Sequence, residues 1–375
     1  MPAYDAFLLL SFGGPEGPDD VLPFLENVTR GRGVPRERLA EVAEHYHAYG
    51  GVSPINDQCR SLLAAVGGAF LAGGVDLPLY WGNRNWQPYL EDTVRQMKAD
   101  GVTRAIAFVT SAYSSYSACR QYLDDIDRAL AAVGSGAADG EAPLRIDKIR
   151  PYFNHPGFIE PFAENVESAL AGLPAAAQAG ARLVFTAHSV PVGMAASSGS
   201  PSTGTAAGAV GGRYAAELRE AARLVSERVR GGSLPFDLVF QSRSGPPSVP
   251  WLEPDVNDHL AALAKGTLTD GAAVPVPAGV VVVPVGFVSD HMEVVHDLDV
   301  EAAETAASLG LPFARAKAPG PAPRFVRMVR ELVEERLSGA EPQALGGFGP
   351  RAYPADGELS CPADCCRYQP ARPRS

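Results

Sequence analysis

The chain has 375 residues, of which 46% are hydrophobic and 20% are charged. This is an ordinary globular composition, so disorder along the whole chain is excluded, and the length favours two domains. The 43 acidic residues outnumber the 32 basic ones, which gives a formal net charge of −11. That balance argues against a nucleic-acid-binding protein, which normally carries a basic face.

The N-terminal sequence MPAYDAFLLLSFGGPEG has no basic segment before its apolar run, so it predicts a first strand rather than a signal peptide. No segment approaches the roughly 18–20 apolar residues that a membrane-spanning helix needs. We therefore expect a cytoplasmic protein with reduced thiols and no transmembrane segment.

Short apolar runs alternate with helical patterns along the chain. The runs are rich in β-branched and aromatic residues, as expected of parallel strands that are buried on both faces. The predicted strands are 6–12, 77–82, 104–113, 144–152, 182–189, 236–242 and 279–287. Helical stretches that end in glycine lie between them, for example YLEDTVRQMKADG. This alternation predicts an α/β protein with mostly parallel sheets.

The pattern runs through two sets that join near residues 140–155, so we expect two doubly wound α/β domains. The expected divisions are an N-terminal domain over 1–150, a C-terminal domain over 151–320, a helix in 321–340 that packs on the first domain, and a cysteine-containing tail over 341–375.

The sequence SDHMEVVHDLDVEAAE follows the predicted strand 279–287 and carries a row of acids. Glu293, Asp297 and Glu301 are four residues apart, and Glu304 falls in the same stripe. On an α-helix each four-residue step advances about 400°, so the acids share one face. From this pattern alone, the row is most simply the solvated side of an amphipathic helix. Its position after a buried strand also places it where α/β sheets bind ligands.

His188, in TAHSVP, lies where the predicted strand 182–189 gives way to a loop. Such a histidine is often structural, but a neutral imidazole at a crevice can accept a proton or bind a borderline metal. Opposite Glu293, it suits either the passage of a divalent cation or a hydrolase pair. The chain has no GxSxG, Walker A, HExxH or well-placed GxGxxG motif, so hydrolase, P-loop, zincin and dinucleotide-binding functions lose their usual support. The 192–212 segment that follows is mostly small residues and is typical of a flexible loop.

Several of these motifs together resemble the ferrochelatase family. In chain order they are LLLSFGGPE, YGGVSPI, GNRNWQPY, TSAYSSYS, TAHSVP, QSRSGPPSVPWLEPD and PVGFVSDHMEVVHDLD. The similarity covers roughly residues 3 to 340 and is closest to actinobacterial, coproporphyrin-type members. It implies two Rossmann-like domains with a porphyrin cleft between them. It also implies insertion of Fe²⁺ into coproporphyrin III to form coproheme in heme biosynthesis.

The resemblance implies roles for individual residues. His188 matches the family's catalytic histidine and Glu293 its partner acid, and both would bind the Fe²⁺ substrate. Asp297 and Glu301 match an outer acidic row that relays the metal. Phe12 stands where many relatives have a tyrosine, so no phenolic ligand is expected from that side. The expected porphyrin contacts are Tyr46, Ser53, Tyr122, Arg30 and Phe12, with Tyr116 and Trp251 as further aromatic walls.

Five cysteines are present, and three of them crowd the tail as CPADCC, which in a reducing compartment suggests metal before disulfide. Some ferrochelatases hold a [2Fe–2S] cluster with three C-terminal cysteines and one internal cysteine. Here the resemblance implies Cys361, Cys365, Cys366 and Cys119. Four thiolates also suit zinc, although adjacent ligands are unusual in zinc sites. Cys59 is more simply a small buried apolar residue.

Other functions remain open at this level: a protoporphyrin IX ferrochelatase, a chelatase that loads cobalt or nickel into a more reduced tetrapyrrole, and a non-catalytic tetrapyrrole or metal carrier. The expected partners are coproporphyrin III and Fe²⁺. Transient contacts with neighbouring heme-pathway enzymes would be compatible with this assignment.

Overall fold

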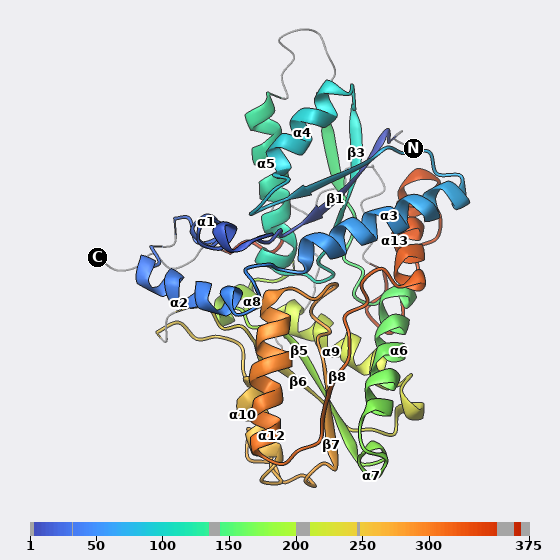
Figure 1. Ribbon diagram of the computed structural model, residues 1–375. Helices are drawn as coiled ribbons and strands as arrows, with labels where there is room; N and C mark the ends of the chain where they lie inside the picture. Colours follow the sequence, from blue (N-terminus) through green and yellow to red (C-terminus); the bar gives the residue numbers. More distant parts are fainter. Residues whose placement is uncertain are drawn as a thin grey trace.

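The computed structural model describes residues 4–31, 33–134, 143–199, 211–245, 248–350 and 364–368. Within them the chain forms two parallel four-stranded sheets, which lie one above the other in Figure 1, each with helices on its faces. The predicted α/β class with parallel sheets is therefore confirmed. No helix in these ranges is long and apolar enough to cross a membrane.

The first sheet has the strand order β2-β1-β3-β4. Its strands are β1 (Ala6–Ser11), β2 (Leu79–Asn83), β3 (Arg104–Val109) and β4 (Arg145–Lys148). Every residue of β1 is buried, because helices cover both faces. Leu8 and Leu10 pack with α4 (Leu90–Ala99) and α5 (Gln121–Val133), whereas Phe7 and Leu9 pack with α3 (Ile55–Gly73). The alternation of side-chain direction along a strand explains why one apolar run serves two cores.

The second sheet has the strand order β6-β5-β7-β8. Its strands are β5 (Ala181–His188), β6 (Phe236–Gln241), β7 (Gly279–Val283) and β8 (Phe313–Arg315). One face packs with α10 (Val256–Leu263) and α12 (Ala303–Ser308), and the other with α6 (Pro156–Gly172) and α9 (Gly212–Ser226). Strand β8 was not predicted, because three residues are too short to show a periodic pattern.

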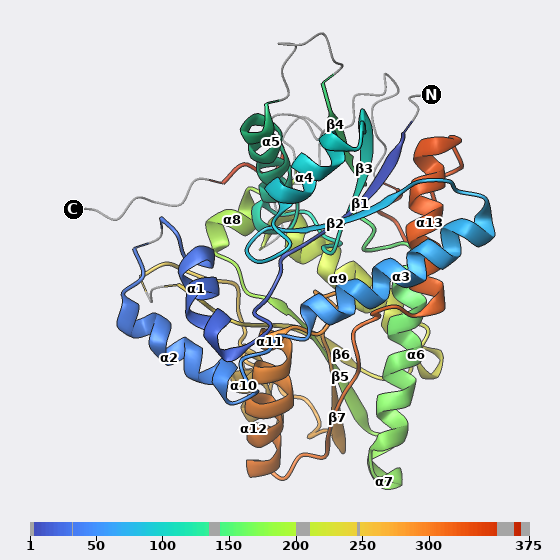
Figure 2. The same ribbon diagram turned by 45° about the horizontal axis from the view of Figure 1, so that its top comes forward.

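Helices α1 and α2 form a separate hairpin at one side of the molecule (Figure 2), with its own small core that includes Val21, Phe24 and Leu39. Helix α13 packs on both α3 and α6, and so contacts a helix from each sheet. The remaining helices are α1 (Pro18–Val28), α2 (Arg36–His47), η1 (Tyr116–Arg120), α7 (Ala175–Gln178), α8 (Val192–Ala196), η4 (Arg230–Gly232), α11 (Met292–Val294), η5 (Val295–Ala302) and α13 (Pro323–Leu337).

The segment 192–212 was predicted to be a flexible loop, but its first residues form the short helix α8. Residues 200–210 of that predicted loop lie outside the described residues.

Candidate active site

His188 is the last residue of β5, at the carboxyl end of the second sheet. Its Nδ1 is in hydrogen-bond contact with the carbonyl oxygen of Ser189. Because a carbonyl oxygen only accepts, Nδ1 carries the hydrogen and Nε2 is left for another partner. The Tyr214 hydroxyl donates to the carbonyl oxygen of His188 at 3.0 Å. The imidazole is therefore positioned through its ring and through its own backbone.

Glu293 lies in the single turn α11, which follows β7 and runs directly into η5. Its Oε2 atom is 3.7 Å from Nε2 of His188 and 3.9 Å from Nδ1 of His291. The Glu293 side chain keeps 45% exposure, so solvent reaches it. A carboxylate between two imidazoles offers the oxygen and nitrogen donors that Fe²⁺ and similar divalent ions accept.

His188 and Glu293 favour each other's charged forms. Burial would lower the pKa of His188, but the charge of Glu293 outweighs it and raises that pKa above its ordinary value. Burial would raise the pKa of Glu293, but the charges of His188 and then His291 lower it to about 2. The pair therefore favours an imidazolium beside a carboxylate more than an isolated histidine would, and a metal ion that binds His188 competes with a proton for the same nitrogen.

The acidic row does not lie on one continuous α-helix, so that part of the prediction is wrong. Residues 295–302 form the π-helix η5, with hydrogen bonds from residue i to residue i+5. Asp297 and Glu301 lie on η5, Glu293 just before it, and Glu304 on α12, where it is exposed. π-helical turns are rare and occur frequently at functional sites.

Asp297 is held by the end of the neighbouring strand β6. The Ser242 hydroxyl donates to Asp297 Oδ2, and Gln241 Nε2 donates to the same atom at 3.3 Å and to the carbonyl oxygen of Glu293 at 3.3 Å. Ser242 has a φ of 59°, a strained value for a residue other than glycine. Burial, with added repulsion from Glu293 and Glu301, raises the pKa of Asp297 to about 7. Asp297 can therefore exchange a proton near neutral pH.

Three residues of this site were missed in the sequence: Gln241, Ser242 and His291. Gln241 and Ser242 begin QSRSGP at the end of a predicted strand, and His291 stands in SDHMEV, so the strand-end rule could have found them. Among the described residues, Gln241 Oε1 is buried with no hydrogen-bond partner.

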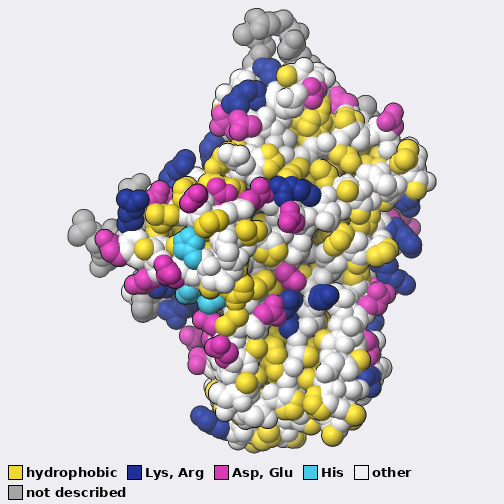
Figure 3. Space-filling view, viewed as in Figure 1, with side chains coloured by type: hydrophobic (Ala, Val, Ile, Leu, Met, Phe, Trp, Pro, Cys, Tyr) yellow, Lys and Arg dark blue, Asp and Glu magenta, His cyan; other side chains and the backbone are white. Residues whose placement is uncertain are grey.

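Further along η5, histidines from two elements meet. The rings of His45, on α2, and His296 stack with centroids 4.1 Å apart, and His296 Nε2 lies 3.5 Å from Glu301 Oε1. Figure 3 shows histidine side chains at the surface near α2, with acidic side chains around them. Within the described ranges, no group of three or more histidine, cysteine, aspartate or glutamate side chains is arranged to hold a metal ion. A cation at Glu293 would therefore take its remaining ligands from water or substrate.

The residues expected to contact the porphyrin differ in their exposure and in their neighbours. Phe12 is 37% exposed and packs edge-on against Phe24. Burial, and then the nearby charges of Glu293 and Asp297, raise the pKa of the Tyr46 hydroxyl. Other expected contacts differ in exposure: Ser53 and Tyr122 are buried, Arg30 is exposed, and Tyr116 and Trp251 are partly buried.

The C-terminal residues 364–368 lie against the loops near the predicted internal cysteine. Cys366 accepts a hydrogen bond through Sγ from Gly199 N at 3.2 Å and donates one from its backbone N to Gly199 O at 2.8 Å. The ring of Tyr368 lies 6.3 Å from that of Tyr116, which begins η1, the helix that carries Cys119. Cys119, Cys365 and Cys366 are buried, and Cys361 lies outside the described residues.

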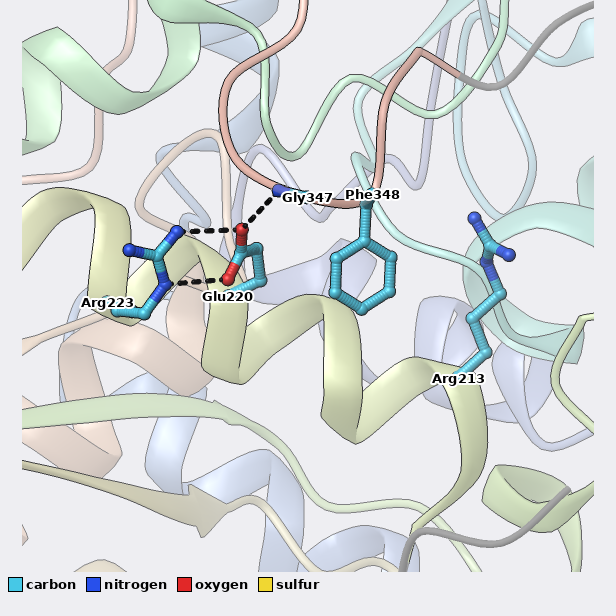
Figure 4. Close-up of a pocket in the computed structure, with 5 residues that line it drawn as sticks. All are labelled: Arg213, Glu220, Arg223, Gly347 and Phe348. Atoms are coloured by element: carbon cyan, nitrogen blue, oxygen red, sulfur yellow. Dashed lines mark hydrogen bonds and ion pairs between the residues drawn. The ribbon is translucent and has the colours of Figure 1, made fainter. Parts of the chain in front are cut away.

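A surface pocket of about 560 Å³ lies away from these residues, over α9 (Figure 4). It is lined by Arg213, Glu220, Arg223, Gly347 and Phe348. Both arginines face carboxylates: Arg213 pairs with Glu217, and Arg223 with Glu220. Each of these cations therefore already has a carboxylate partner, which weakens the attraction of the pocket for an anion.

Comparison with known proteins finds a family profile, relatives of similar sequence and a solved structure of similar fold. The family profile described as Ferrochelatase matches residues 4–337. A protein named Ferrochelatase from Rhodopirellula baltica is 51% identical over 100% of this chain and 96% of its own. A protein named Coproporphyrin III ferrochelatase from Streptomyces griseus is 51% identical over 99% of this chain and 95% of its own. A solved structure, SirB from Bacillus subtilis with Fe³⁺, aligns at a TM-score of 0.48 and 13% identity, over 89% of this chain and 97% of that one.

Proposed function

This chain belongs to the ferrochelatase family, and from that premise we propose that it inserts Fe²⁺ into coproporphyrin III to give coproheme. The observation that carries the proposal is the pairing of His188 with the partly exposed carboxylate of Glu293, whose Oε2 lies 3.7 Å from Nε2 of the imidazole. The choice of coproporphyrin is supported by relatives of about half-identical sequence that bear that name, including those from Streptomyces griseus and Streptomyces coelicolor.

Metal insertion exchanges two pyrrole N–H protons for one Fe²⁺, so the site must bind the cation and then accept protons. Glu293 and neutral His188 would supply an oxygen and a nitrogen to the incoming ion, with water completing its shell. When the ion passes to the macrocycle, the same two groups regain their affinity for protons. Asp297, whose pKa is about 7, can pass a proton outward along η5. Asp297 and Glu301 would also hold hydrated Fe²⁺ on its way in.

The porphyrin contacts belong to the same proposal. Exposed apolar residues follow two strand ends, with Phe12 after β1 and Val192 after β5, and a flat macrocycle would cover them. Tyr46, Ser53, Tyr122 and Arg30 would supply polar contacts to the propionates. Tyr122 is the weakest of these, because its ring is buried under the guanidinium of Arg84.

The test is an anaerobic assay in which Fe²⁺ is added to protein and coproporphyrin III and the visible spectrum is followed. We expect conversion by the native chain and its loss in His188→Ala, with porphyrin binding retained. His47→Ala is the matched control, because His47 is an exposed histidine at the end of α2. Porphyrin binding without conversion by the native chain would instead identify a carrier. Faster metallation of protoporphyrin IX than of coproporphyrin III would refute the substrate assignment.

We also propose a [2Fe–2S] cluster bound by Cys119, Cys361, Cys365 and Cys366. Support comes from the burial of the three described thiols and from the contacts of residues 366 and 368 with Gly199 and Tyr116. The cluster would fasten the tail to η1. Iron and sulfide analysis with visible absorption should show about one cluster per chain, lost in Cys361→Ser and kept in Cys59→Ser. A colourless protein with stoichiometric zinc would replace this assignment with a zinc site. A cytoplasmic location remains a prediction from the sequence.

A further inference from the structure

Arg315, the last residue of the edge strand β8, joins two aspartates that lie on either side of Glu293 in the sequence. Its Nη1 and Nη2 donate to the two carboxylate oxygens of Asp290 at 3.1 and 3.4 Å. Its Nε and Nη2 donate to the two oxygens of Asp299, the latter at 2.9 Å. One guanidinium, only 13% exposed, thus makes a two-pronged contact with each carboxylate.

Asp290 is also held through its backbone, by a helix that packs on the first sheet. Gln58, on α3, donates from Nε2 to the Asp290 carbonyl oxygen at 3.0 Å and accepts from the Asp290 N–H at 2.9 Å. Because α3 packs on the first sheet and β8 belongs to the second, Asp290 is fixed from both.

These contacts bracket the metal-binding segment. Asp290 lies three residues before Glu293, and Asp299 lies two residues after Asp297, inside the π-helix η5. The Glu293 carboxylate lies 3.7 and 3.9 Å from the imidazole nitrogens of His188 and His291, which is too long for firm hydrogen bonds. The backbone that carries Glu293 therefore helps to set the position of its carboxylate, and Arg315 ties the chain before Glu293 to the helix after it.

We propose that Arg315 is a positioning residue for the cation site, and that its paired contacts with Asp290 and Asp299 hold Glu293 and Asp297 at the spacing that a divalent ion requires. The inference rests on the proposed function for the identity of the ion. Lysine cannot substitute, because one ammonium lacks the planar fork that engages two carboxylates at once. Loss of such an outer support typically weakens metal affinity by about 10- to 100-fold.

The chain offers a matched control in Arg182 on β5. Its guanidinium makes a two-pronged pair with Asp237 and is 10% exposed, so it resembles Arg315 in burial and chemistry. It lies six residues before His188, which on a strand is about 20 Å from the site. Arg315→Lys and Arg182→Lys should therefore cost similar stability while only the first disturbs the metal site.

The experiment compares these two variants with the native chain in two assays. In iron insertion, Arg315→Lys should raise KM for Fe²⁺ by about tenfold or more, with KM for coproporphyrin III within about twofold, whereas Arg182→Lys should leave both unchanged. In the absence of porphyrin, Co²⁺ titration followed by its visible absorption should show the same weakening of the dissociation constant. The cobalt titration stands even if iron insertion itself is not observed, so failure of the proposed function can be told apart from failure of this inference.

Two outcomes would overturn the proposal. One is native KM for Fe²⁺ and native Co²⁺ affinity in Arg315→Lys. The other is an equal loss in Arg182→Lys, which would trace the effect to general stability. If Arg315→Lys does not fold, Gln58→Glu provides the second variant. It removes the donor to the Asp290 carbonyl and places a negative charge there, and it should weaken Co²⁺ binding in the same direction. Native Co²⁺ affinity in a folded Gln58→Glu would then count against the proposal.

Discussion

Arg150, which lies between β4 and α6, forms a buried ion pair with Glu335 on α13. The geometry of this pair predicts how much the free energy of unfolding falls when the pair is broken. Arg150 Nε and Nη2 each donate to one carboxylate oxygen of Glu335, on α13, at 2.8 Å. The remaining donors reach the carbonyl oxygens of Pro151 at 3.2 Å and Gln343 at 2.9 Å. The two side chains are 1% and 6% exposed, so water cannot replace a lost partner.

Glu335→Ala should leave the Arg150 charge buried without its carboxylate. Breaking one side of such a pair costs about 3–5 kcal/mol. At about 2–4 °C per kcal/mol for a chain of 150–250 residues, and less for a longer one, the melting temperature should fall by roughly 5–15 °C. Glu91→Ala is the control, because its pair with Arg95 is about half exposed on both sides and should contribute under about 1 kcal/mol.

The assay is urea unfolding followed by circular dichroism, for the single variants and for the double variant Arg150→Met/Glu335→Leu. Replacing both charges with apolar side chains removes the unpaired charge, so the double variant should be more stable than Glu335→Ala. Equal losses in Glu335→Ala and Glu91→Ala would refute the reasoning. So would a double variant less stable than the single one, since the cost would then not come from an unpaired charge.

Three further predictions follow from the site and its supports. In Glu293→Gln, burial should dominate and bring the pKa of His188 below its ordinary value, as read from histidine proton shifts in an NMR titration; a pKa that stays raised would point to another acid. Burial, then the charge of Arg150, lowers the pKa of His155 to about 3, so the unfolded chain binds a proton below about pH 6.5 that the folded chain does not. Stability should therefore fall by up to about 1.4 kcal/mol per pH unit from pH 6.5 downward, and in His155→Asn, which keeps an N-cap acceptor, urea midpoints at pH 7 and 5 should differ less. Tyr214→Phe leaves the His188 carbonyl without its donor, so it should cost about 1–3 kcal/mol in unfolding free energy and lower kcat; an unchanged kcat would show that this bond does not orient the imidazole.

Much of the fold was predictable because its signals are local. The runs AFLLL and VVVV are apolar at every position, as expected of strands covered on both faces, and all residues of β1 and β7 are buried. The short strand β8 and several helices carried no such signal. His188 and Glu293 were singled out because His188 ends a buried strand and Glu293 follows another, at the sheet edge where parallel sheets bring ligand-binding residues together.

The sequence by itself determined the class of fold, the edge of the sheet where chemistry lies, and, through its family motifs, the pair His188 and Glu293. It could not determine the helix that carries the acidic row. A π-helix and an α-helix of the same residues differ only in which carbonyl each N–H reaches, so local preference does not decide between them. Contacts from distant residues surround the segment instead: Gln58 is 232 positions from Asp290, and Arg315 joins Asp290 to Asp299 across η5. Such contacts exist only once both sheets are folded and packed together, so the geometry of the segment that carries Glu293 and Asp297 is a property of the tertiary structure.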